Sequence, residues 1–262
     1  EPAEAIAVLL KGRSPALVLD YDGTLTAENE RPGGMISGAA KRALFDAAER
    51  FPVAILSGRS LDELHAIADI PRVFYAASYG LDIAGPGLRL QHPFATETLP
   101  ALDAAGKRLQ TQIEKIQGAR IERERFGIVV RYELASDNDV PRIEALIDEV
   151  NRSLPQLRKT VGSRTLALRP DMDWDKGHAL RWLLLALDLE GAGVLPIYVG
   201  DDPADEDAFQ ALRTTGVGVL VSQRAHPSMA EFRVEGPQQV VDLIRALTRA
   251  HETLAPGERM PT

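Results

Sequence analysis

The segment from Asp20 to Thr24 carries two carboxylates separated by a single residue. Because side chains two residues apart leave an extended chain on the same side, Asp20 and Asp22 can act on one substrate atom. One carboxylate can attack as a nucleophile while the other transfers protons. Gly23 lets the backbone turn away from that atom. An ordinary solvated turn is the alternative interpretation for such a pair, and the residues around it decide between the two.

A second acidic group places five carboxylates between Asp201 and Asp207, directly after an apolar run. Carboxylates this close repel one another unless a cation lies among them. The alternative is a helix N-terminus, where acidic side chains interact favourably with the helix dipole. We expect both, with Asp205 beginning a helix that runs through Leu212 and Asp201 facing a metal ion. The spacing of a calcium-binding loop is absent.

Two further groups offer positive charge or hydrogen-bond donors. Ser57-Gly58-Arg59 supplies a hydroxyl and backbone amides, which would cradle an anion if a helix begins at Leu61. A plain helix cap is the alternative. Lys176 lies near the start of a helix predicted over 179–187, where the helix dipole disfavours a cation. A bound phosphate would compensate for that cost.

Buried parallel strands must position these groups. The strands are predicted from four apolar runs without polar alternation, at 16–19, 53–56, 195–199 and 217–221. Three of the runs end in the polar groups described above. Because ligands bind at the carboxyl ends of strands in open α/β sheets, these endings predict one shared site. A helical pattern over 37–50 supplies a crossover between the first two strands.

The middle of the chain shows a different pattern. An amphipathic helix is predicted over 102–116, a half-exposed strand within 121–134, a second helix over 140–154 and a further strand over 164–169. Together they predict a small α+β unit. The stretch Ala84-Gly85-Pro86-Gly87 is the predicted hinge into this unit.

Composition limits the classes of function. The chain has 262 residues, 45% of them hydrophobic, a formal net charge of −8 and no cysteine. These values exclude a disulfide scaffold, thiolate metal sites and thiol catalysis, and they favour oxygen ligands and Mg²⁺. We expect neither a nucleic-acid nor a membrane partner and a cytoplasmic location; a monomer is compatible with the sequence. The chain begins at Glu1 instead of methionine, so removal of a leader stays an open alternative.

The order of the four groups resembles the haloacid dehalogenase superfamily, whose motifs match Asp20–Thr24, Ser57, Lys176 and Gly200–Asp205. Within it, three segments are similar to the trehalose-6-phosphate phosphatases, namely Leu56–Arg59, Asp173–Gly177 and Gly200–Phe209. The resemblance covers residues 17–222. It implies an α/β fold, with a Rossmann-like parallel-sheet core over 1–84 and 168–262 and an inserted α+β cap over 85–167.

The resemblance also implies roles for individual residues. Asp20 would attack phosphorus and form an aspartyl-phosphate, and Asp22 would protonate the departing sugar oxygen and later activate water. Ser57 and Lys176 would bind the phosphoryl oxygens, with Gly58 and Arg59 in the same pocket. The Mg²⁺ ion would be held by the carboxylates of Asp20 and Asp201, the Asp22 carbonyl, and Asp202 or Asp205 through water.

Substrate choice is expected to reside in the cap, where Glu122, Glu124 and Arg131 are the candidate sugar-binding residues. The chain departs from the family in the cap, where Glu124 replaces a lysine and Arg131 replaces a histidine, and in the core, where Tyr79-Gly80 replaces the usual His-Gly after the third core strand. A different set of hydrogen bonds would select a different sugar. The implied chemistry is therefore more strongly supported than the identity of the substrate.

Several functions therefore stay open. Trehalose 6-phosphate is the first choice of substrate, and sucrose phosphate, glucosylglycerol phosphate and mannosyl-3-phosphoglycerate are alternatives with the same chemistry. A phospho-accepting receiver domain would also group acidic residues with a lysine, but it is about half as long and has no cap. A non-catalytic sugar-phosphate sensor would not need both Asp20 and Asp22. The side chains of Trp174, Trp182, His178 and His226 are expected to have no direct part in the chemistry.

Overall fold

The protein is described by a computed structural model, which covers residues 2–26 and 34–254. The chain divides into two compact units, one formed by residues 1–90 and 174–262 and the other by residues 91–173. The α/β class and the large, mainly parallel sheet expected from the sequence are confirmed. No helix within the described residues is both long and apolar enough to cross a lipid bilayer.

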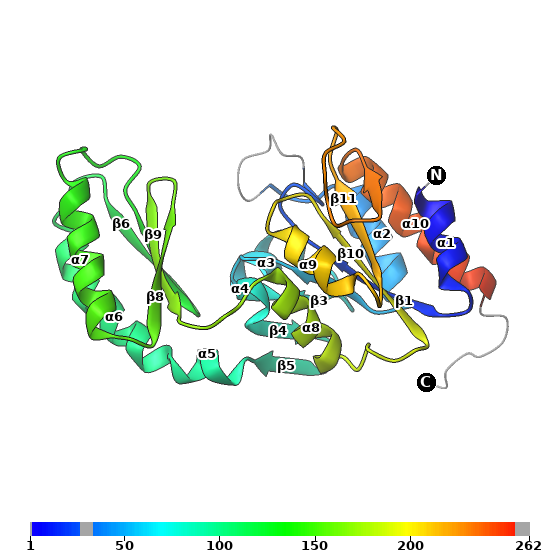
Figure 1. Cartoon of the computed structure of the whole chain (residues 1–262), viewed down its shortest axis with the longest axis horizontal. Coiled ribbons are helices and arrows are strands. Elements are labelled where there is room, and N and C mark those ends of the chain that lie inside the picture. Colours follow the sequence, from blue (N-terminus) through cyan, green and yellow to red (C-terminus); the bar gives the residue numbers. More distant parts are fainter. Residues whose placement is uncertain (1, 27–33, 255–262) are drawn as a thin grey trace. The chain divides into compact units, whose positions relative to one another are not determined.

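The first unit is built on an eight-stranded sheet (Figure 1). In spatial order its strands are β12 (Phe232–Val234), β11 (Val217–Val221), β10 (Val194–Gly200), β1 (Ser14–Leu19), β2 (Val53–Leu56), β3 (Phe74–Ala76), β4 (Asp82–Gly85) and β5 (Leu88–Gln91). The six strands from β12 to β3 pair in parallel, and β4 pairs with β3 in the antiparallel direction. The four apolar runs correspond to β1, β2, β10 and β11.

Both faces of this sheet are buried, because alternate residues of β1 enter two different hydrophobic cores. Leu17 and Leu19 pack with α1 (Pro2–Leu10), α2 (Gly38–Ala48), α3 (Leu61–Ala68) and α10 (Pro237–Leu254). Ala16 and Val18 pack with α8 (Lys176–Ala186) and α9 (Asp205–Leu212) on the other face. Burial on both faces explains why these strands show no polar alternation.

The second unit pairs an antiparallel sheet with two helices. The strands, in spatial order, are β6 (Arg120–Glu124), β7 (Gly127–Arg131), β9 (Thr165–Pro170) and β8 (Leu157–Gly162). Ile128, Val130, Leu166 and Leu168 point to the core that the sheet shares with α6 (Leu99–Ile113) and α7 (Val140–Ser153). The short helix α5 (Pro93–Glu97) precedes α6.

The strand predicted within 121–134 corresponds to β7, but the prediction missed β6, with which β7 forms a hairpin. The two strands are joined at Arg125-Phe126, which is not a pair that typically marks a tight turn. Strand β8 has no counterpart among the predicted elements. Its core contribution comes mainly from Leu157, so it lacks a sustained alternating pattern.

The unit boundaries lie at 90/91 and 173/174, six residues after each boundary predicted from the sequence. The predicted hinge at 84–87 is instead the turn between β4 and β5, two neighbouring strands of the large sheet. The second boundary lies later in the chain than predicted because β9 runs to Pro170 and is paired with β8 of the smaller sheet along its whole length.

The loop from Ser57 to Arg59 is followed by a separate helix cap. Ser60 is the N-cap of α3: its Oγ accepts a hydrogen bond from the Glu63 amide at 3.3 Å, and Glu63 Oε2 accepts one from the Ser60 amide at 2.8 Å. The alternative in which Ser57 only caps a helix is therefore wrong. Its side chain belongs to the loop at the end of β2.

Replacing Ser60 tests this cap. Ser60→Ala removes the acceptor for the Glu63 amide and should lower the free energy of unfolding by about 1 kcal/mol. The thermal midpoint, measured by circular dichroism, should fall by about 2–4 °C in a chain of this size. Ser60→Thr keeps a hydroxyl at the same position and is the matched control. Equal losses in the two variants would mean that the hydroxyl does not stabilise α3.

Candidate active site

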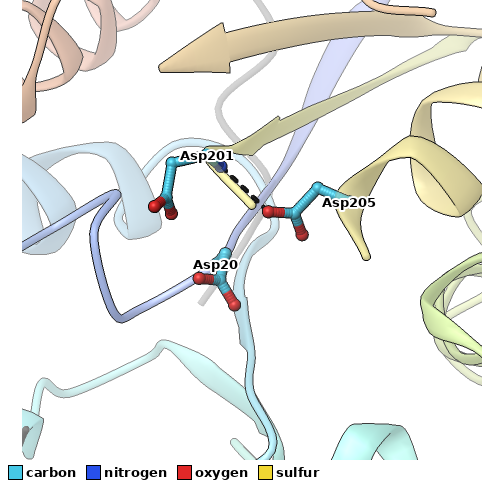
Figure 2. A group of neighbouring side chains, drawn as sticks. All are labelled: Asp20, Asp201 and Asp205. Carbon is cyan, nitrogen blue, oxygen red and sulfur yellow. Dashed lines mark hydrogen bonds between the residues drawn. The ribbon is translucent and has the colours of Figure 1, made fainter. Parts of the chain in front are cut away.

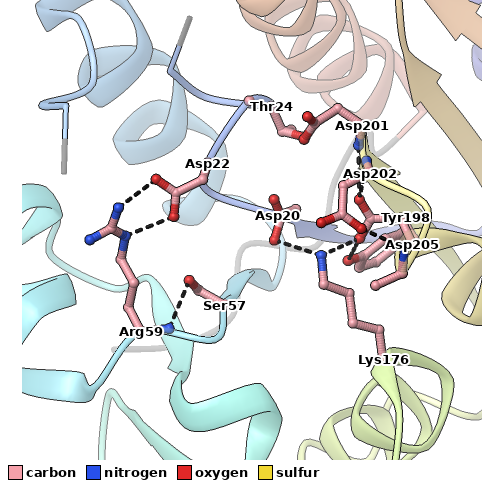
Figure 3. A network of polar contacts seen from close by, with 12 residues as sticks. Asp20, Asp22, Thr24, Ser57, Arg59, Lys176, Tyr198, Asp201, Asp202 and Asp205 are labelled. Atoms are coloured by element: carbon pink, nitrogen blue, oxygen red, sulfur yellow. Dashed lines mark hydrogen bonds and ion pairs between the residues drawn. The ribbon is translucent and has the colours of Figure 1, made fainter. Parts of the chain in front are cut away.

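The predicted site residues follow the carboxyl ends of adjacent strands, as the sequence indicated. Asp20 follows β1, Ser57 follows β2, and Asp201 follows β10, while Lys176 is the first residue of α8. Strand β1 lies between β2 and β10, and Leu19 is in register with Val199. Figure 3 shows the side chains that gather at this edge of the sheet.

Lys176 forms the centre of a buried ion cluster. Its side chain is almost inaccessible to solvent, and its Nζ lies 3.0 Å from Asp20 Oδ1 and 2.6 Å from Asp205 Oδ1. The sequence indicated that a cation at a helix start needs a compensating partner, and a phosphate was the predicted one. In this structure the two carboxylates take that place. Burial acts to lower the pKa of Lys176, but attraction to Asp20 and Asp205 outweighs it and raises the pKa above its ordinary value.

Asp205 organises the cluster through both of its oxygen atoms and is fully buried. Its Oδ1 accepts hydrogen bonds from Lys176 Nζ and, at 2.6 Å, from the hydroxyl of Tyr198. Its Oδ2 accepts from the backbone amides of Asp201 and Asp202, each at 2.9 Å. Asp205 also begins α9, as predicted. These four bonds fix the loop after β10 relative to α8.

The first motif, Asp20–Thr24, also holds the side chain of Asp201. Thr24 Oγ1 donates a hydrogen bond to Asp201 Oδ1 at 2.9 Å. Gly23 adopts a positive φ of 81°, and a Cβ atom built on it would lie only 1.9 Å from Asp201 Oδ2. Glycine is therefore required there both by its backbone conformation and by the close approach of the carboxylate.

Three carboxylates converge in this cluster, as Figure 2 shows. Asp20, Asp201 and Asp205 each offer one oxygen, and these oxygens lie within 4.8 Å of one another. The Asp202 carboxylate lies outside this group and accepts a hydrogen bond from the Ala204 amide. An all-oxygen donor set of this kind suits a hard cation such as Mg²⁺, so the residues present fit the ion expected from the sequence.

The pKa values of two of these carboxylates reflect their burial first and their crowding second. Burial raises the pKa of Asp20 to about 8; Lys176 opposes this shift, while Asp205 and Asp201 add to it. Burial also raises the pKa of Asp201 to about 6, with the Thr24 hydrogen bond opposing and Asp205 adding to the shift. The negative charge gathered here is therefore only partly balanced by Lys176.

Asp22 and Arg59 form a two-pronged ion pair at the rim of the cluster (Figure 3). Arg59 Nε lies 2.7 Å from Asp22 Oδ2, and the second guanidinium nitrogen lies 2.6 Å from Asp22 Oδ1. The Arg59 guanidinium also stands 5.7 Å from the centroid of the Tyr21 ring. The nearby Ser57 Oγ accepts a hydrogen bond from the Arg59 amide at 3.2 Å. The structure thus brings the second motif beside the first.

The candidate sugar-binding residues belong to the second unit. Glu122, Glu124 and Arg131 lie on the sheet face opposite α6 and α7, since the alternate positions Ile121, Ile128 and Val130 point into the core shared with these helices. Arg131 Nε lies 2.7 Å from Glu122 Oε2, and Arg169 lies 3.0 Å from Glu124 Oε2. These residues form charged pairs with one another, and their part in substrate binding stays a prediction.

Sequence reasoning did not assign roles to Thr24 and Tyr198. The only signal for Tyr198 was a hydroxyl-bearing residue within the otherwise apolar run of β10. Its side chain is buried, and burial together with the nearby Asp205 raises its pKa well above the ordinary value. Trp174 packs against the core of α8 and α9 and donates a hydrogen bond to the Tyr79 carbonyl at 2.7 Å.

Comparison with known proteins gives a consistent result. The model of the trehalose-phosphatase family matches residues 18–238. The chain is 35% identical over 257 residues to probable trehalose-phosphate phosphatase D of Arabidopsis thaliana, a match that covers 93% of this chain and 70% of that protein. It is 34% identical over 261 residues to trehalose 6-phosphate phosphatase RA3 of Zea mays, covering 93% of this chain and 72% of that protein.

A solved structure described as a trehalose-6-phosphate phosphatase related protein has the same fold. It superposes with a TM-score of 0.73 at 21% identity, covering 91% of this chain and 99% of that chain. The family resemblance inferred from the four motifs is therefore confirmed.

Removing the Asp205 carboxylate should damage the stability of the first unit. Asp205→Ala leaves Asp20 as the one buried partner of Lys176 and removes the acceptor of the Tyr198 hydroxyl. The free energy of unfolding should therefore fall by about 3 kcal/mol. Asp207→Ala, two residues further along α9 at an exposed position, is the control and should change it by less than about 0.5 kcal/mol. Urea denaturation measures both. Similar values for the two variants would show that the cluster does not depend on Asp205.

Proposed function

Because this chain belongs to the trehalose-phosphatase family, we propose that it hydrolyses trehalose 6-phosphate to trehalose and phosphate. Membership of the family makes the chain a phosphoric monoester hydrolase. The relatives named above carry this activity in their descriptions, and they support the choice of substrate. The observation that carries the proposed chemistry is the meeting of Asp20, Lys176 and Asp201 at one edge of the sheet.

Asp20 is proposed to be the nucleophile. One of its carboxylate oxygens would attack the phosphorus in line with the sugar oxygen, so that a phosphorus–oxygen bond forms on Asp20 as the bond to the sugar breaks. Water would then release phosphate from the aspartyl-phosphate. Lys176, 3.0 Å from Asp20 Oδ1, and Ser57 would bind phosphoryl oxygens, where charge accumulates in the transition state.

Asp22 is proposed to move the protons in both steps. It would give a proton to the departing sugar oxygen and later take one from the attacking water. In the structure both of its carboxylate oxygens accept hydrogen bonds from Arg59. Because proton transfer needs one of these oxygens, Arg59 would have to release at least part of its hold when the substrate binds.

Mg²⁺ is the proposed cofactor, held by the carboxylates of Asp20 and Asp201. The Asp22 carbonyl, Asp202 and Asp205 stay predictions as further ligands. When bound, the ion would supply positive charge that lets a carboxylate and an anionic phosphoryl group approach each other. Asp205 already accepts four hydrogen bonds, so its proposed part is to orient Asp201 and Lys176 around the ion and to reach the ion only through water. A cytoplasmic location and a monomeric state stay predictions from the sequence.

A phosphate-release assay tests the function directly. The purified chain is offered trehalose 6-phosphate, sucrose 6-phosphate, glucosylglycerol phosphate and mannosyl-3-phosphoglycerate, with Mg²⁺ and with EDTA. We expect trehalose 6-phosphate to give the highest kcat/KM, EDTA to abolish turnover and added Mg²⁺ to restore it. Asp20→Asn, which keeps the shape of the side chain, should reduce kcat by more than about a thousandfold.

Each result of this assay has a distinct meaning. Preference for another sugar phosphate would replace the substrate and leave the chemistry in place. Substantial turnover by Asp20→Asn would remove Asp20 from the nucleophile role. Binding of sugar phosphates without turnover under any condition would favour the sensor alternative.

The cap residues are tested by their effect on selectivity. Arg131→His and Glu124→Lys should each change the ratio of kcat/KM for trehalose 6-phosphate over sucrose 6-phosphate by about tenfold, because each alters a charged hydrogen-bonding group. Lys107→Ala, at an exposed position of α6, is the control and should leave this ratio unchanged. If neither cap variant alters the ratio, these positions do not read the sugar.

A further inference from the structure

A strained turn lies directly after β3. It contacts residues 57–59, which we call the second-motif loop. It falls within the short helical segment α4 (Ala77–Gly80), in which three consecutive residues have positive φ angles. Ser78 has φ 50° and ψ 47°, Tyr79 has φ 57° and ψ 40°, and Gly80 has φ 81°. Only glycine adopts this left-handed conformation at little cost, so Ser78 and Tyr79 carry backbone strain.

Hydrogen bonds from two other segments hold the turn in place. The Ser78 amide donates to the Arg59 carbonyl at 2.7 Å, and the Tyr79 amide donates to the Ser57 carbonyl at 2.8 Å. The Tyr79 carbonyl in turn accepts from Trp174 Nε1 at 2.7 Å. The turn therefore ties the second-motif loop to the segment that leads into α8. Strain that the surroundings enforce in this way is typical of functional sites.

This backbone places the phenol end of Tyr79 on the second-motif loop. A Cβ atom built on Gly58 would lie 2.6 Å from Cζ and 2.8 Å from the hydroxyl oxygen of Tyr79. The residue is nevertheless 38% exposed, so part of it faces solvent. The phenol end of Tyr79 therefore lies against Gly58, the residue between Ser57 and Arg59 in the chain.

We propose that Tyr79 is a specificity-determining residue that contacts the sugar part of the phosphate ester. This proposal rests on the proposed function and deepens it. The anionic part of the substrate already has its partners in Lys176 and Ser57. A neutral phenol with an aromatic face and a polar tip instead matches the CH groups and hydroxyls of a sugar.

A purely structural role for Tyr79 makes a different prediction. If the ring only holds the Gly58 loop in place, its loss should impair every phosphate ester to a similar extent. If it contacts the sugar, its loss should impair a disaccharide phosphate more than p-nitrophenyl phosphate, which has no sugar. The ratio of kcat/KM for these two substrates therefore separates the two roles.

The test compares Tyr79→Phe and Tyr79→Ala with the unchanged chain, using trehalose 6-phosphate and p-nitrophenyl phosphate. Tyr79→Phe removes only the hydroxyl and should lower the ratio about tenfold, mainly through a higher KM for the sugar phosphate. Tyr79→Ala also removes the ring and should lower the ratio further. Unchanged ratios in both variants would overturn the proposal, whatever happens to the absolute rates.

Tyr75→Phe is the matched control, because Tyr75 lies on β3 and its hydroxyl bonds within the core, accepting from the Ile70 amide at 2.8 Å. It should leave the ratio unchanged, and an equal fall would count against a specific contact by Tyr79. Failure of the proposed function is recognised separately in the unchanged chain. If that chain prefers another sugar phosphate, the comparison is made with that ester, and if it hydrolyses none, both proposals fall.

Discussion

Repulsion between buried carboxylates is the constraint on which the site depends. Asp20, Asp201 and Asp205 converge within a few ångströms, and burial of Asp20 and Asp205 removes most of the water that would otherwise screen their charges. Lys176, the Tyr198 hydroxyl and two backbone amides offset part of this cost. Burial first, and then the neighbouring carboxylates, raise the pKa values of Asp20 and Asp201, so the compensation is incomplete. A divalent cation would complete it, so the feature that makes the site costly also suits it to hold a metal ion.

The fold can sustain this arrangement because the charged residues stand at the ends of rigid elements. Strands β1, β2 and β10 are adjacent, in parallel and packed on both faces, so the loops that follow them begin at nearly the same level. The positions of individual side chains in the site then depend on two glycines whose backbone lies close to them. At Gly23 no side chain fits beside Asp201, and at Gly58 the ring of Tyr79 takes the space that a side chain would need.

The residues proposed to carry out the reaction differ from those proposed to select the substrate. The residues proposed to bind phosphate are held by buried ion pairs and by strand ends, where a small displacement would cost much free energy. Tyr79 is more accessible, and its turn is bonded to the backbone of Ser57 and Arg59. The charged pairs of the smaller sheet form an independent set within their own unit. Under the roles proposed for Tyr79 and the smaller unit, substrate preference would change at those positions while the ion cluster stays intact.

The sequence by itself determined the parts of the protein that local chemistry encodes. Uninterrupted apolar runs predicted the central strands, the polar residues that follow them predicted one shared site with a metal ion, and the resemblance of the four motifs predicted a phosphatase, because each signal lies in short stretches of the chain. Only the tertiary structure decided that Asp20 and Asp205 are the partners of Lys176, that Tyr198 joins them, and that 121–134 folds as a hairpin. It also decided the left-handed turn at Tyr79. Lys176 and Asp20 are 156 positions apart, and their contact arises from strand order and helix packing, which no local pattern in the sequence specifies.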